Sequence, residues 1–175
     1  MKLFGPLSRS IAVAGLVGAS LMAAAPAFAA KADIELLNSY LGNWKGKGVL
    51  VGQESETVVC RLSLTPGNAD KVNYSGRCAL AGTNLSVNGT LAYIDGKKRY
   101  EAAMTSNATF SGIAVGKKQG NGVVFNLRER ETDEEGNDLT ITAVIALINK
   151  KISVEFQVLF NTSGDIIKAS VPFSK

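Results

Sequence analysis

The sequence predicts an all-β protein: an antiparallel up-and-down β-barrel of about 8–10 strands with one short N-terminal helix. Three observations predict it. Apolar and polar residues alternate with period two from Trp44 onward, short turns rich in Gly, Asn and Asp interrupt the alternation, and no composition break divides the chain. Such alternation with short connections is typical of consecutive antiparallel strands with one buried face. Closing the sheet removes its unpaired edges, so we expect a barrel before the alternative, a two-sheet sandwich.

The first 29 residues have the pattern of a secretory signal peptide. Lys2 and Arg9 form a basic start, residues 11–25 form an apolar run rich in small residues, and Ala27-Phe28-Ala29 fits a signal peptidase site. The run is shorter than the roughly 20 residues that a membrane span needs. We expect cleavage after Ala29, a single mature domain at 30–175 without a transmembrane anchor, and a periplasmic or secreted location in a bacterium.

Charge and composition exclude several classes of function. The chain has 19 basic and 15 acidic residues, and two of the basic residues belong to the predicted signal peptide. The remaining net charge of about +2, with short basic runs at expected turns, does not indicate a nucleic-acid partner. The chain has no histidine, which excludes hydrolysis by a histidine base and histidine-ligated metal or haem. We expect no cofactor, no metal and no enzymatic activity.

One helix and ten strands are expected in the mature chain. Residues 32–41 form a helix with Ile34, Leu37 and Leu41 on one face, Asp33 in position to cap it, and Gly42 at its end. The helix segment at 30–42 precedes the barrel at 43–175. The expected strands are 44–51, 56–65, 71–80, 85–94, 98–105, 109–116, 121–131, 138–148, 151–160 and 165–173.

The two cysteines, Cys60 and Cys78, fall on neighbouring expected strands. If they lie opposite each other, the apolar residues of both strands share one face, whereas a slip by one residue sets Leu62 against Arg77. In an oxidising compartment such a pair forms a disulfide. A redox or metal site is disfavoured because there is no Cys-x-x-Cys and no third soft ligand. The further pairs expected in this register are Leu62 with Gly76, Leu64 with Tyr74, and Val58 with Leu80.

The sequence around Trp44 resembles a known element. Leu41-Gly42-Asn43-Trp44 is similar to the Gly-x-Trp start of lipocalin-like (calycin) barrels, in which the tryptophan closes one end of the barrel beneath the helix. With Gly46, Gly48, Val59-Cys60-Arg61 and Gly76-Arg77-Cys78, the pattern resembles a family of small secreted alphaproteobacterial β-barrel proteins without an agreed activity. That resemblance covers most of the mature chain and implies its fold and compartment.

Two other families share parts of this pattern. The chain resembles the periplasmic metalloprotease inhibitors, which combine an N-terminal segment, an eight-stranded barrel, a Gly-x-Trp and one disulfide, although more strands are expected here. It also resembles the nitrobindin-type haem barrels in strand number, but their haem is held by a histidine that this sequence lacks.

The barrel interior is the candidate site. Large inward side chains either fill the space that inward Gly46, Gly48, Gly76 and Gly89 leave, or an apolar cavity remains there for a small lipophilic ligand. The sequence leaves both interpretations open. The residues expected to line such a cavity are Trp44, Tyr74, Tyr93, Tyr100, Met104, Phe125 and Phe156.

Three further features lie near the expected rim or on the outer face. Glu129 and Glu131 continue the inward alternation beyond Leu127 and are expected near one rim. The acidic run at 133–138 lacks the spacing of a calcium loop and is expected to be a solvated hairpin tip. An outer apolar patch is expected to be covered by the N-terminal helix, by a second copy in a homodimer, or by a partner protein; its residues are Val144, Ala146, Ile148 and Leu159.

These observations lead to two functional hypotheses. The first is a non-catalytic periplasmic or secreted barrel that binds a small apolar ligand or acts at the cell envelope. The alternative is a protein-interaction module, such as a periplasmic protease inhibitor.

Overall fold

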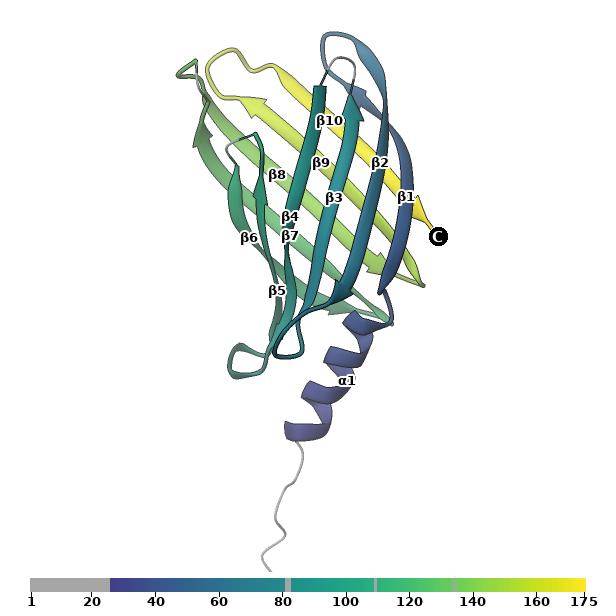
Figure 1. Ribbon diagram of the computed structural model, residues 1–175. Coiled ribbons are helices and arrows are strands. Elements are labelled where there is room, and N and C mark those ends of the chain that lie inside the picture. Colours follow the sequence, from purple (N-terminus) through teal and green to yellow (C-terminus); the bar gives the residue numbers. More distant parts are fainter. Residues whose placement is uncertain (1–25, 81–82, 109, 134) are drawn as a thin grey trace, which may run out of the picture.

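The computed structural model describes residues 26–80, 83–108, 110–133 and 135–175, with side chains from residue 30 onward. Within them, ten antiparallel strands form a closed barrel in chain order, with β1 paired to β10, and a helix lies at one end (Figure 1). The predicted barrel is confirmed, and the sandwich alternative is wrong. The elements are α1 Pro26–Asn38, β1 Gly42–Val51, β2 Ser55–Pro66, β3 Val72–Leu80, β4 Thr83–Ile94, the 3-10 helix η1 Asp95–Lys97, β5 Arg99–Ser106, β6 Ser111–Gln119, β7 Gly122–Thr132, β8 Asp138–Ile148, β9 Lys151–Phe160 and β10 Ile166–Ser174.

Helix α1 differs from its predicted bounds and from its predicted buried face. It begins at Pro26 and ends at Asn38, so Asp33 lies inside the helix and does not cap it. Its buried residues are Asp33 and Leu37, followed by Tyr40 in the turn, whereas Ile34 and Leu41 are only partly buried. The predicted face is therefore confirmed at Leu37, and Leu41 packs against the core, but Asp33 is buried in place of Ile34. The chain then enters β1 through Gly42, whose φ of +128° is a conformation that favours glycine.

The predicted export segment is largely outside the described part of the chain. Residues 1–25 lie outside it, and the expected cleavage position after Ala29 falls within α1. Among the described residues, no helix is long and apolar enough to cross a membrane. Cleavage and export stay predictions.

The cysteine register is confirmed. Cys60 and Cys78 are directly paired between β2 and β3, their Cα atoms are 4.0 Å apart, and they form a disulfide. The same ladder pairs Leu62 with Gly76 and Leu64 with Tyr74, as expected. Both cysteines have inward parity, and Cys60 is almost completely buried. The disulfide thus fixes the register of a hairpin whose apolar face lines the barrel.

We expect replacement of both cysteines by alanine to lower the free energy of unfolding by about 3 kcal/mol, because the disulfide restricts the unfolded chain across this loop. Urea unfolding of the variant and of the oxidised parent measures the difference. Reduced parent protein should unfold at nearly the same urea concentration as the variant. Equal stability of oxidised and reduced parent protein would contradict a structural role for the bond.

The predicted outer apolar patch is divided by the register of β8 and β9. Asn149 and Lys150, both with positive φ, form the two-residue turn that sets Ile148 against Lys151. In this register Leu159 lies beside Thr140 and Ile166, away from Val144. Helix α1 packs at the barrel end, mainly against β4, and does not cover this face. The expectation of one patch beneath the helix is therefore wrong; a second copy or partner protein stays a prediction.

Candidate functional site

The two ends of the barrel interior differ in how completely they are filled. At the end that carries α1, inward side chains such as Val72, Val123 and Phe125 have no solvent-exposed surface. Several inward side chains toward the other end keep part of their surface exposed, whereas Val58, Leu139 and Ile141 there are buried. The partly exposed ones are Leu50, Leu62, Val87, Phe156, Val158 and Phe160. An inward residue of a closed barrel reaches solvent through an end of the barrel. We therefore call the first region the closed end and the second the open half.

Trp44 and the turn before it seal the closed end. Trp44 is 3% exposed, and its Nε1 donates a hydrogen bond of 3.0 Å to the carbonyl oxygen of Tyr40. The Lys175 ammonium lies 4.8 Å from the centre of the Trp44 ring and donates a hydrogen bond of 2.8 Å to the Leu41 carbonyl oxygen. The last residue of the chain thus holds the linker between α1 and β1. Trp44 occupies the position that the Gly-x-Trp resemblance implies.

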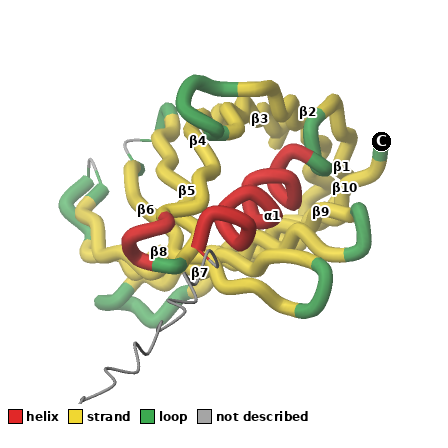
Figure 2. The backbone as a smooth tube through the Cα atoms, turned by 90° about the horizontal axis from the view of Figure 1, so that it is seen from below, coloured by secondary structure: helices red, strands yellow, loops and turns green. Residues whose placement is uncertain are grey.

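Asp33 attaches α1 to the barrel. Its carboxylate accepts hydrogen bonds from the Tyr100 hydroxyl, at 2.6 Å, and from the Lys118 ammonium, at 3.1 Å. Figure 2, viewed from this end, shows α1 lying across the barrel. Burial and then the bond to Asp33 raise the pKa of Tyr100 above its ordinary value, and burial followed by the charge of Asp33 raises that of Tyr93. These two hydrogen bonds therefore fix α1 against β5 and β6.

Tyrosine burial predicts a loss of stability at alkaline pH. The pKa of Tyr100 is raised in the folded protein, so its contribution is complete below the ordinary value of 10.0 and is lost as pH rises through the folded value. We expect the free energy of unfolding to fall between pH 9 and pH 12. Tyr100→Phe should show a shallower fall, measured by urea unfolding across this range. An equally steep fall in the variant would contradict the assignment to Tyr100.

The inward glycines show which half of the interior is filled. A Cβ on Gly46 would lie 2.7 Å from Val171 and 2.8 Å from Phe173, and one on Gly116 would lie 2.7 Å from Phe125. These glycines are covered by the large side chains opposite them. At Gly76 a Cβ would instead meet only ordinary contacts, with Val87 O at 3.6 Å and Leu62 Cδ1 at 3.7 Å. Of Gly46, Gly116 and Gly76, only Gly76, in the open half, accepts a Cβ without displacing a neighbour.

The seven residues predicted to line a ligand site do not come together in one place. Tyr93, Tyr100 and Phe125 form a chain of edge-to-face rings at the closed end, with centroids 5.1 and 6.3 Å apart, and Trp44 stacks on Tyr40 at the same end. Tyr74 covers Gly89 and donates a hydrogen bond of 3.0 Å to the Ala103 carbonyl oxygen. Burial raises the pKa of Tyr74 strongly.

Of the same seven, Met104 is 7% exposed, and Phe156 is partly exposed in the open half. Sequence reasoning missed Asp33 and Lys118 because it treated them as a helix cap and a solvated turn lysine. The spacing of Asp33, Leu37 and Tyr40, typical of one helix face, could have revealed Asp33.

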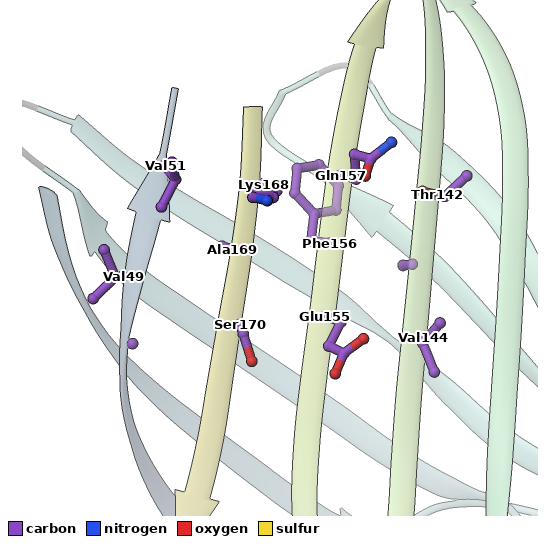
Figure 3. A pocket seen from close by; sticks show the side chains of 12 residues that line it. Val49, Val51, Thr142, Val144, Glu155, Phe156, Gln157, Lys168, Ala169 and Ser170 are labelled. Carbon is purple, nitrogen blue, oxygen red and sulfur yellow. The ribbon is translucent and has the colours of Figure 1, made fainter. Parts of the chain in front are cut away.

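Two grooves lie on the outer face of the barrel. The first, of about 540 Å³, crosses β1, β10, β9 and β8 (Figure 3). Most of its lining side chains alternate with inward residues and so face outward; Val49, Val51 and Val144 supply apolar surface, and Glu155 and Lys168 supply charge. The second, of about 550 Å³, crosses β4, β5 and β6. Neither groove is the predicted interior site.

The acidic hairpin between β7 and β8 has a structural explanation. The Asp133 carboxylate accepts hydrogen bonds from the backbone amides of Glu135 and Asn137 and from the Asn137 side chain, which lower its pKa. Arg130 pairs with Asp138 at 2.8 Å. Across the described ranges, no three Cys, Asp or Glu side chains gather closely enough to hold a metal ion. The carboxylates of Asp133 and Asp138 therefore stabilise the hairpin itself.

The fold is similar to solved structures of low sequence identity. Rv2717c from M. tuberculosis superposes with a TM-score of 0.61 and 12% identity, covering 81% of this chain and 97% of that one. The S-type phycobiliprotein lyase CPES from Guillardia theta gives a TM-score of 0.48 and 10% identity, covering 79% and 89%. No protein-family model and no curated protein sequence matches the chain. The first likeness supports the barrel fold, and no family is shown.

Proposed function

We propose that the protein is an exported, non-catalytic barrel that binds a small apolar ligand in its open half. The observation that carries the proposal is the room beside Gly76, next to inward apolar side chains that keep part of their surface exposed. Concave apolar surface that is partly accessible is the usual setting for small lipophilic ligands. The aromatic cluster and α1 close the other end, so a ligand would enter opposite the helix.

The absence of a suitable set of catalytic side chains supports a non-catalytic function. The chain contains no histidine, and Glu129 and Glu131 lie without an aromatic sugar platform in the expected interior. The signal-peptide pattern, together with the disulfide, supports export to the periplasm or beyond and an action at the cell envelope.

Native mass spectrometry of the protein purified from a bacterial host that expresses the full chain tests the proposal. We expect a periplasmic species that spans Ala30–Lys175, lacks two protons, and carries an adduct that organic solvent extracts. A polypeptide retaining its first 29 residues would contradict export. A bare protein that also fails to take up added apolar compounds would contradict ligand binding.

The outer groove favours the second candidate function, a protein-interaction module. Val49 and Val51 are 51% and 37% exposed and lie in the groove with Glu155 and Lys168. Exposed apolar side chains framed by charge are typical of protein contacts. Val49→Lys should leave ligand uptake unchanged whichever candidate function is correct. If the protein is an interaction module, the same substitution should abolish binding of a partner protein or dimer formation, measured by pull-down and light scattering.

A further inference from the structure

Glu129 brings a carboxylate into the open half of the barrel. It follows Leu127 on the inward face of β7 and is partly buried. A Cβ on Gly112 of β6 would lie 3.2 Å from Glu129 Cγ and 3.3 Å from Oε1. The Glu129 side chain therefore lies over Gly112, in space that a larger residue there would occupy. Glu131 continues the same inward row toward the rim.

No described cation neutralises Glu129. Across β8 its partner is Ile141, and Arg128 and Arg130 alternate to the outer face, where Arg130 pairs with Asp138. Within the described residues, no side chain forms a hydrogen bond or ion pair with Glu129. A carboxylate beside apolar surface is stabilised when a positive group approaches it.

The loops around the open end carry the same sign of charge. In the described parts of the loops at 52–54, 107–110, 133–137 and 161–165, every charged residue is acidic: Glu54, Asp133, Glu135 and Asp165. The loops at the closed end are mainly basic, with Asp70 and Asp95 beside four lysines: Lys71, Lys97, Lys98 and Lys150. Clustered charge of one sign at the mouth of an apolar cleft concentrates ligands of the opposite sign.

We propose that the ligand is an amphiphile with an apolar body and a cationic head, such as a protonated or quaternary amine. This rests on the proposed function of the open half. The apolar body would lie among Leu62, Val87 and Phe156, and the head would lie against Glu129 with Glu131 toward the rim. The acidic rim would attract cationic amphiphiles and repel fatty acids.

Displacement of N-phenyl-1-naphthylamine, a neutral apolar fluorophore, tests apolar binding and recognition of the cationic head separately. Three compounds share one chain and differ in head charge: decyltrimethylammonium, 1-decanol and decanoate. We expect decyltrimethylammonium to displace the probe at an about tenfold lower concentration than 1-decanol, because charge-assisted contacts contribute that much. Decanoate should be the weakest, and added salt should narrow the spread.

Glu129→Gln and Glu35→Gln form the matched pair of variants. Glu35 is exposed on α1, at the closed end, so its replacement should keep the ratio between decyltrimethylammonium and 1-decanol. Glu129→Gln should reduce that ratio about fivefold. Equal displacement by the three compounds, or an unchanged ratio in Glu129→Gln, overturns the cationic ligand while apolar binding stands. Failure of the parent protein to bind the fluorophore overturns both proposals.

Discussion

Replacing Phe125 by alanine should lower the free energy of unfolding by about 3–5 kcal/mol. Phe125 has no exposed surface, covers Gly116, and packs edge-to-face on Tyr100 with centroids 6.3 Å apart. Truncation of Phe125 leaves a cavity in the barrel. Because β7 is paired with both β6 and β8, the surrounding strands cannot move in to fill that cavity. Urea unfolding measures the loss.

The matched control is Phe156→Ala in the open half. Phe156 keeps part of its surface exposed, so its truncation removes less buried area and should cost about half as much or less. If the two variants lose the same stability, the closed end is no better packed than the open half, and the division of the interior is wrong.

The second large effect is expected for Gly89→Ala. A Cβ at this position would collide with the backbone carbonyl oxygen of Ala103 and lie 2.7 Å from the Tyr74 hydroxyl. Because the first contact is backbone, β4 and β5 must separate, and the hydrogen bond from Tyr74 to Ala103 is lost. We expect a loss of about 3 kcal/mol in unfolding free energy.

Gly76→Ala is the control for that substitution, on the neighbouring strand β3. Its Cβ would meet nothing closer than 3.6 Å, so the free energy of unfolding should change by less than about 1 kcal/mol. Thermal unfolding of the two variants measures the contrast. Equal stability of the Gly89→Ala and Gly76→Ala proteins would contradict the close approach of β5 to Gly89 of β4.

Much of the architecture could be predicted because it depends on local pattern. Alternation assigned the inward faces of β7, β8 and β9, and Cys60 and Cys78 fixed the register of one hairpin. The bounds were less exact: β6 was expected at 109–116 and spans Ser111–Gln119. Strand ends depend on the partner ladder, which a single strand does not reveal.

The features that were missed depend on residues far apart in the chain. Asp33 is buried because Tyr100 and Lys118, from β5 and β6, converge on it. Which glycines are covered likewise depends on neighbours across strands, as Phe173 covers Gly46 and nothing comparably close covers Gly76. By contrast, the separation of Leu159 from Val144 could have been derived from the two-residue turn at Asn149 and Lys150. That derivation requires the turn type rather than alternation alone.

Titration of N-phenyl-1-naphthylamine into the parent protein, Gly76→Leu and Gly96→Leu tests the central claim most directly. Gly76→Leu adds a large inward side chain in the open half, at a position where a Cβ meets only ordinary contacts. Gly96 lies in the exposed 3-10 helix η1, where a Cβ meets nothing within 4 Å. We predict saturable binding of one probe to the parent and to Gly96→Leu, and an affinity reduced by at least about tenfold in Gly76→Leu with unchanged thermal stability. Equal binding by all three proteins, or no binding by the parent, would contradict a ligand site in the open half.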